Sequence, residues 1–161
     1  MADLATRIGT NVRRMSALVA ELQDTHPTRE IDATISTPIA LSCDRSLVQQ
    51  LLSNLLANAL THGAQDRKVE MSAQIVGEEL QIAVLSQGEP VPPASIEKIF
   101  APFWRRSSAP QREGLGLGLH ISEQIAKAHG GSIRVASSAE SGTRFTAVLP
   151  LAGPVPAADA A

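Results

Sequence analysis

The stretch that decides the fold lies at residues 114–120 and reads Gly114-Leu115-Gly116-Leu117-Gly118-Leu119-His120. Three glycines at alternate positions let the backbone approach a ligand closely. Leu117, Ile121 and Ile125 then recur every four residues, so a helix is expected to begin inside the glycines or directly after them. A helix start presents unpaired N–H groups and the positive end of the dipole, which attract phosphate. Taken alone, the segment leaves a flexible lid or a tight helix entry as open alternatives.

Two familiar nucleotide motifs fit this stretch poorly. A Walker A loop needs Lys and Ser or Thr after the glycines, and His120 follows them instead. A dinucleotide fingerprint needs G-x-G-x-x-G directly after a strand. Here the glycines fall as G-x-G-x-G after the polar, proline-broken residues 107–113, which disfavours that motif.

A second pattern runs from residue 45 to residue 62. Asn54, Asn58 and His62 follow at intervals of four, so they form one stripe beside the apolar face of a predicted helix. Amide oxygens at this spacing are suitable ligands for Mg²⁺, which prefers oxygen. The alternative is a polar stripe that only faces water. The apolar face comprises Val48, Leu51, Leu52, Leu55 and Ala59.

Together, these segments resemble the ATP-binding domain of bacterial sensor histidine kinases, in the Bergerat-type ATPase superfamily that also holds gyrase. The resemblance runs from about residue 40 to residue 150, most of the chain. Six segments occur in the order of the family: the asparagine box at 51–62, the first glycine box at 84–92, the phenylalanine box at 99–105, the second glycine box at 114–119, and the closing strands around 129–133 and 141–145.

The resemblance implies a site for ATP and Mg²⁺. Asn58 would be the Mg²⁺ ligand, Asn54 its neighbour near the phosphates, and His62 a contact to the ribose or phosphates. The hinge of a lid over the phosphates would comprise Gly114, Leu115, Gly116, Leu117, Gly118 and Leu119. The other implied ATP-binding residues are Ser86, Gly88, Pro90, Phe103 and Thr143, the last in the network at the adenine. Gyrase-type hydrolases carry a glutamate at the position of Asn54, which cannot act as a base, so efficient intrinsic hydrolysis is not expected.

The chain departs from the family pattern in the first glycine box. Ser86 stands where the family usually has an aspartate that accepts from the adenine amino group, and Pro90 replaces the second glycine. A neutral hydroxyl is a weaker acceptor than a carboxylate, which lowers affinity about tenfold. Thr61 also stands where many relatives place a lysine. Weak ATP binding is therefore expected.

Composition sets further bounds. With 161 residues, 43% of them hydrophobic, the chain can bury the core of one domain. The net charge of −2 without a basic block gives no support for nucleic-acid binding. A single cysteine, Cys43, excludes an internal disulfide and fits a reducing cytosol. No apolar run is long enough to span a bilayer, so this segment is expected to be cytoplasmic without membrane contact; any anchor would belong to the full-length protein.

The N-terminal residues show a heptad seam: Leu4, Ile8, Asn11, Met15, Leu18 and Leu22. The resemblance places part of the second dimerisation and phosphotransfer helix here, over residues 1–25, which would form a homodimer in the full-length protein. The alternative is a helix packed on its own domain. Residues 24–29 are predicted as a hinge, residues 30–150 as the ATP-binding domain, and residues 151–161 as a disordered tail.

The order of predicted elements gives the fold class. Residues 30–43 are expected to be extended, 69–75 and 80–85 to form paired strands, 95–99 a short helix, and 132–137 with 144–149 a final hairpin. This order predicts an α/β (α+β) two-layer sandwich with a mixed sheet covered on one face by helices. The resemblance implies that this sandwich is the Bergerat ATPase fold.

No histidine of the chain lies on the N-terminal helix followed by an acidic residue, as a phosphoacceptor would. We therefore assign no catalytic residue within the chain. The chain is expected to position Mg-ATP for transfer to a histidine outside it, in a sensor histidine kinase that passes phosphate to a response regulator. Two alternatives stay open: a degenerate regulatory or dimerisation module, and a serine-directed anti-sigma-factor kinase of the same fold.

Overall fold

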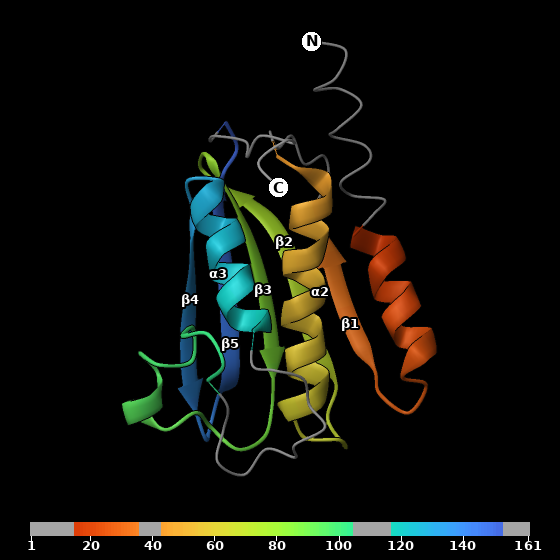
Figure 1. Cartoon of the computed structure of the whole chain (residues 1–161). Helices are drawn as coiled ribbons and strands as arrows, with labels where there is room; N and C mark the ends of the chain where they lie inside the picture. The colour runs from red at the N-terminus through yellow and green to blue at the C-terminus, as the bar shows by residue number, and fades with distance from the viewer. Residues whose placement is uncertain (1–14, 36–42, 105–116, 153–161) are drawn as a thin grey trace.

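The computed structural model describes residues 15–35, 43–104 and 117–152, and they form a two-layer sandwich (Figure 1). Helices α2 (Arg45–His62) and α3 (Gly118–Ala128) lie side by side on one face of a five-stranded sheet. Only the β1–β2 pair is parallel, so the sheet is mixed, as predicted. In sheet order the strands are β1 (Ile31–Ile35), β2 (Val69–Val76), β3 (Glu79–Ser86), β5 (Gly142–Pro150) and β4 (Ser132–Ser138).

Alternation along the central strands places one apolar row under the helices. In β3 this row is Leu80, Ile82 and Val84, which stand opposite Leu149, Ala147 and Phe145 of β5. Four leucines of α2 complete the core, and each is fully buried: Leu51, Leu52, Leu55 and Leu56. Because each buried leucine contributes about 2 kcal/mol by leaving water, this seam holds α2 on the sheet.

The start of α2 is capped and tied to the end of α3. The carboxylate of Asp44 accepts from the N–H of Leu47 at 3.1 Å and so caps the helix, and Cys43 beside it is buried. The N–H of Asp44 in turn donates to Nε2 of His129 at 3.1 Å, while Nδ1 of His129 lies 2.8 Å from the carbonyl of Ile125. Since Nε2 accepts, the proton must reside on Nδ1. A single neutral imidazole therefore joins the two helices.

The described part of the N-terminal helix, residues 15–25, packs on its own domain. Met15 and Leu18 are buried in the main core, and Leu22 packs against it. This packing favours the alternative in which the heptad seam belongs to a helix packed on its own domain. The homodimer through this helix stays a prediction. Residues 1–14 lie outside the described residues.

Three segments outside the long elements have defined backbone contacts. In the segment 24–29, where a hinge stays a prediction, the N–H of Arg29 donates to the carbonyl of His26 at 3.0 Å, and Arg29 itself is buried. The helix expected at 95–99 is a 3₁₀ turn at Pro93–Ser95, earlier than predicted, because the prolines at 92 and 93 suit a helix start. In the tail predicted as disordered, the N–H of Leu151 donates to the carbonyl of Glu78 at 2.9 Å; residues 153–161 lie outside the described residues.

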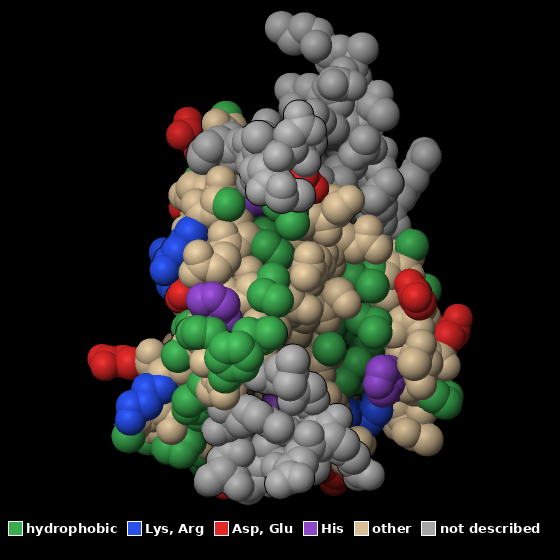
Figure 2. All heavy atoms as spheres, viewed as in Figure 1, with side chains coloured by type: hydrophobic (Ala, Val, Ile, Leu, Met, Phe, Trp, Pro, Cys, Tyr) green, Lys and Arg blue, Asp and Glu red, His purple; other side chains and the backbone are tan. Residues whose placement is uncertain are grey.

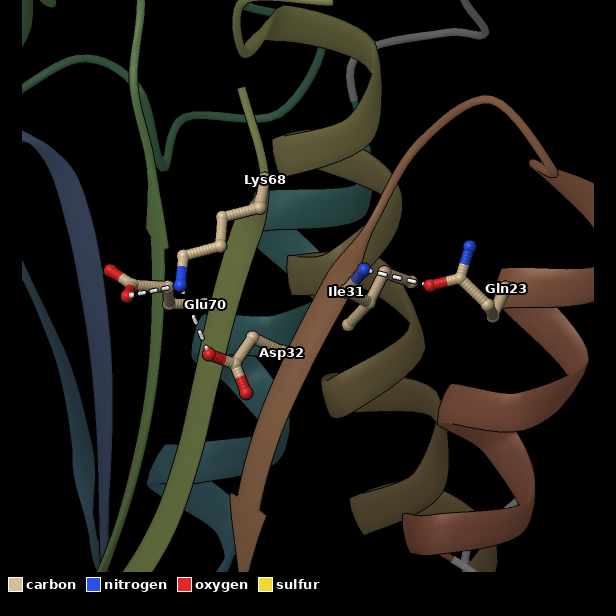
Figure 3. A network of polar contacts seen from close by, with 5 residues as sticks. All are labelled: Gln23, Ile31, Asp32, Lys68 and Glu70. Carbon is tan, nitrogen blue, oxygen red and sulfur yellow. Dashed lines mark hydrogen bonds and ion pairs between the residues drawn. The ribbon is translucent and has the colours of Figure 1, made fainter. Parts of the chain in front are cut away.

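The solvent face of the sheet carries a small charged group beside β1. Lys68 lies 3.2 Å from Asp32 and 3.7 Å from Glu70, and the hydrogen bond and charge of Asp32, with the charge of Glu70, raise the pKa of Lys68 (Figure 3). These side chains are about half exposed, so they contribute little to stability. Among the described residues, no helix has the length and apolar character to cross a membrane.

Candidate functional site

The end of α2 meets the end of β3 at very close range. Gly63 ends the helix, and a Cβ built on it would lie 2.9 Å from Cβ of Ser86 and 2.5 Å from the carbonyl oxygen of Ala59. Its φ of −73° is open to any residue, so the requirement for glycine here is one of space. Ser86 is therefore held directly beneath the last turn of α2.

Two further glycines pack closely here, Gly142 against Ser86 and Gly88 against the residues that follow α2. A Cβ on Gly142 would lie 2.5 Å from the carbonyl oxygen of Ser86, and one on Gly88 would lie 2.9 Å from the backbone nitrogen of Ala64. Both have positive φ, +82° and +133°, which other residues rarely adopt. We call the group Gly63, Ser86, Gly88, Gly142 and Thr143 the glycine corner. Its shape comes from the close approach of backbone segments around Ser86.

A short hydroxyl network forms one side of the glycine corner. Thr143 pairs with Ser86 across β3 and β5. Its Oγ1 lies 2.7 Å from Oγ of Ser137, which also accepts from the N–H of Val91 at 2.8 Å. Thr143 is buried, and no hydrogen bond links the hydroxyl of Ser86 to another described residue. Ser86 can thus offer its hydroxyl to a ligand.

The start of α3 forms the other end of the site. The side-chain amide of Asn54 donates to the carbonyl of Gly118 at 3.2 Å and so links α2 to the first residue of α3. No described side chain caps this helix start, and its first turn contains no acidic residue. Unpaired N–H groups and the positive dipole end thus combine without a competing negative charge, which favours a phosphate here. We call Asn54, Leu117 and Gly118 the α3 entrance.

Asn58 and His62 lie on α2 between the glycine corner and the α3 entrance, and both are half-buried. The amide of Asn58 makes no hydrogen bond with another described residue and can provide one neutral oxygen ligand. In the described ranges, no group of three or more His, Cys, Asp or Glu side chains could hold a metal ion. This donor set therefore fits Mg²⁺ only where a nucleotide and water complete the shell, the usual arrangement for that ion.

The aromatic residues before the α3 entrance divide into two kinds. Phe100 packs edge-on against Phe145, with ring centroids 6.2 Å apart, and lies against the core. Phe103 differs, because its side chain is 66% exposed and its φ is +66°. Hydrophobic side chains gather on the surface around the start of α3 (Figure 2). Phe103 is consequently available to a ligand or partner.

The structure brings most of the predicted residues to one edge of the sandwich. Ser86, Gly88 and Thr143 meet in the glycine corner, with half-buried Pro90 two residues beyond Gly88. The helix α3 begins at Gly118, the last of the three glycines, so it starts inside the glycine run, one of the two places predicted. Leu117 precedes it, and Leu119 packs on the core. Gly114, Leu115 and Gly116 lie outside the described residues.

Sequence reasoning missed two glycines of the corner. Gly63 directly follows the predicted helix, and a glycine at that position is a common helix terminator. Gly142 follows a serine before the last strand, a typical turn signal. Either signal indicates a turn, whereas the approach to Ser86 depends on the tertiary fold.

The sequence and the structure of the chain are both similar to those of known sensor kinases. Residues 43–153 match the family model for histidine kinase-, DNA gyrase B- and HSP90-like ATPases. The chain is 35% identical to the alginate biosynthesis sensor protein KinB of Pseudomonas aeruginosa over 69% of its own length and 18% of that protein. It is 32% identical to the signal transduction histidine-protein kinase ArlS of Staphylococcus epidermidis, over 83% of this chain and 30% of the relative.

Solved structures of sensor histidine kinases have a similar fold. The mycobacterial sensor histidine kinase MprB superposes with a TM-score of 0.78 at 26% identity, covering 89% of this chain and 95% of that one. Full-length ShkA in complex with AMPPNP superposes with a TM-score of 0.72 at 26% identity, over 86% of this chain and 30% of ShkA. The chain spans less than a third of the length of the curated relatives it matches.

Proposed function

This chain belongs to the histidine kinase-, DNA gyrase B- and HSP90-like ATPase family, and from that premise we propose that it binds Mg-ATP for γ-phosphoryl transfer to a histidine of a sensor kinase. The observation that supports this most is the arrangement along α2. The glycine corner lies at one end, the uncapped α3 entrance at the other, and Asn58 and His62 between them. The ShkA complex, which holds a nucleotide analogue, has the same fold.

In this proposal the glycine corner binds the adenine. The Ser86 hydroxyl accepts from the adenine amino group, and Thr143, which pairs with Ser86 across the strands and bonds to Ser137, lies beside that contact. Gly63 and Gly142 let the backbone pack closely around Ser86 and so fix the position of its hydroxyl. Because a hydroxyl is a neutral acceptor, the dissociation constant is expected at tens to hundreds of micromolar, roughly tenfold weaker than with a carboxylate.

The phosphates then extend toward the α3 entrance. The N–H groups of the first turn of α3 donate to them, and His62 contacts the ribose or phosphates from the end of α2. Asn58 holds Mg²⁺, which when bound neutralises charge on the phosphate oxygens. Asn54 positions the start of α3 by its bond to Gly118 and cannot remove a proton from water. The chain therefore orients the nucleotide and does not favour hydrolysis.

Transfer requires an acceptor from outside these residues. The acceptor imidazole forms the N–P bond as the bond between the γ-phosphorus and the bridging oxygen breaks, and ADP leaves. This chain contributes position and electrostatic stabilisation. A response regulator as the next acceptor, and a homodimer through the N-terminal helix, belong to the same proposal, as does Phe103 as a nucleotide contact.

Isothermal titration with a non-hydrolysable ATP analogue and Mg²⁺ tests the proposal. We expect binding that weakens about tenfold when Asn58 is replaced by alanine, and a smaller response of that variant to Mg²⁺. Gln74→Ala, on an exposed position of β2, is the matched control and should bind as the unmodified chain does. Absence of heat at millimolar analogue would contradict the proposal and favour a degenerate regulatory module.

A further inference from the structure

Arg29 is a buried cation for which the proposed function has no role. It is 4% exposed, and its Nη1 donates to the carbonyl of Leu60 at 2.6 Å, with a longer contact of 3.5 Å from Nη2 to the carbonyl of Arg67. No described residue accepts from its Nε. Burying a charged guanidinium against carbonyl groups, with one N–H donor unsatisfied, costs free energy. The presence of Arg29 at this buried position therefore calls for an explanation.

The carbonyl that Arg29 contacts belongs to the last turn of α2. The last four carbonyls of a helix lack partners within the helix and carry the negative end of its dipole. Leu60 accepts both from Arg29 and, at 3.3 Å, from the side chain of Gln65. Arg29 therefore caps α2 from a segment 31 residues earlier in the chain.

Gln23 fixes the turn that carries Arg29. Its Oε1 accepts from the N–H of Ile31 at 2.8 Å, and its Nε2 donates to the carbonyls of His26 and Arg29. Figure 3 shows Gln23 reaching from the end of the N-terminal helix to the start of β1, on the side of the strand away from Lys68. One side chain of the helix thus holds both ends of the turn.

The same turn of α2 reaches the nucleotide site. Leu60 lies between Asn58 and His62, and Gly63 directly after the turn packs at close range on Ser86. A shift of the Leu60 carbonyl must move these neighbours, because packed interiors do not deform smoothly.

We propose that Gln23 and Arg29 form a clasp through which the N-terminal helix sets the position of the last turn of α2 and so the affinity of the nucleotide site. Displacement of the helix loosens the turn at 26–31, and Arg29 then releases the Leu60 carbonyl. The inference rests on the proposed function for its effect on nucleotide, whereas the mechanical link is independent of it.

Amide hydrogen exchange in the nucleotide-free chain tests the link. The N–H of Gly63 bonds to Ala59 and that of Ala64 to Gln87, so both amides report on the last turn. Arg29→Met should raise their exchange about tenfold, Gln23→Met about threefold although Gln23 touches neither, and Arg29→Lys should restore part of the protection. Lys68→Met, which removes only ion pairs on the solvent face beside β1, should change neither amide.

Nucleotide titration of the same variants completes the test. We expect each of Gln23→Met and Arg29→Met to weaken analogue binding by about the factor by which it raises amide exchange. The clasp would be overturned if Gln23→Met raised exchange only at residues 23–31, or if Arg29→Met raised it uniformly through the core. If the unmodified chain binds no nucleotide while Gly63 still responds to Gln23→Met, the proposed function fails and the link stands. Should Arg29→Met not fold, Gln23→Met and Arg29→Lys decide the matter.

Discussion

Replacing Gly63 by alanine tests whether space at the end of α2 shapes the site. The new Cβ would lie 2.5 Å from the carbonyl oxygen of Ala59 and 2.9 Å from Cβ of Ser86, both well inside contact distance. The Ala59 carbonyl already accepts the cap hydrogen bond from Gly63 at 2.8 Å, so relief of the clash must lengthen that bond.

The magnitude follows from these contacts. Overpacking costs about 1–3 kcal/mol, and the lost cap bond about 1 kcal/mol more. Against this, alanine lowers the entropy of the unfolded chain by less than about 1 kcal/mol, since the φ of −73° suits it. We expect a net loss of about 2–3 kcal/mol in the free energy of unfolding by urea denaturation, together with weaker analogue binding.

Gly77 provides the matched control, because substitution there is limited by the backbone conformation and not by space. Nothing lies within 4 Å of a Cβ built there, but its φ is +63°. Gly77→Ala should cost about 1–2 kcal/mol through backbone strain alone and leave nucleotide affinity unchanged. If Gly63→Ala destabilises the chain less than Gly77→Ala does, or binds the analogue with full affinity, the close approach of α2 to Ser86 does not shape the site.

Two further substitutions test separate contacts. His129→Leu removes the imidazole that joins Asp44 to Ile125 and should lower the free energy of unfolding, measured in urea, by about 2–4 kcal/mol. His129→Gln keeps one of the two hydrogen bonds and should lose less. An unchanged urea midpoint in His129→Leu would show that this imidazole does not hold the two helices together. Ser86→Asp should tighten binding of the ATP analogue about tenfold by titration, and no gain would show that this position does not face the adenine.

The elements of the sandwich followed from local signals. The leucine spacing of α2 and the Asp44 cap fix that helix, and alternation in β3 and β5 fixes which side chains enter the core. The stripe of Asn54, Asn58 and His62 also follows from periodicity alone. The N-terminal seam was harder, because a heptad pattern predicts an apolar face without saying which partner covers it. Met15 and Leu18 find that partner within their own domain.

Contacts between distant segments could not be predicted from the sequence. Arg29 has no periodic neighbour that marks it as buried, and its carbonyl partner on Leu60 depends on how β1 lies beside α2. The same holds for His129, whose two bonds join residues 85 and 4 positions away. The side chains of Arg29 and His129 bond to backbone groups far along the chain. A sequence pattern gives the type of each side chain but not the position of a distant backbone group, so these contacts could not be predicted.

The two ends of the site also differ in how they tolerate change. The glycine corner is shaped by backbone atoms around Gly63 and Gly142, so exchange of the Ser86 hydroxyl for another small polar group alters what a ligand meets without altering the shape. At the α3 entrance, the Asn54 amide itself joins α2 to α3, so a change there also moves a helix start. Two departures from the family pattern, Ser86 and Pro90, fall at or beside the glycine corner, and the third, Thr61, lies in the last turn of α2. We therefore expect weakened binding of the base at a site whose geometry is kept, which favours a low-affinity kinase domain over a module that has lost its nucleotide.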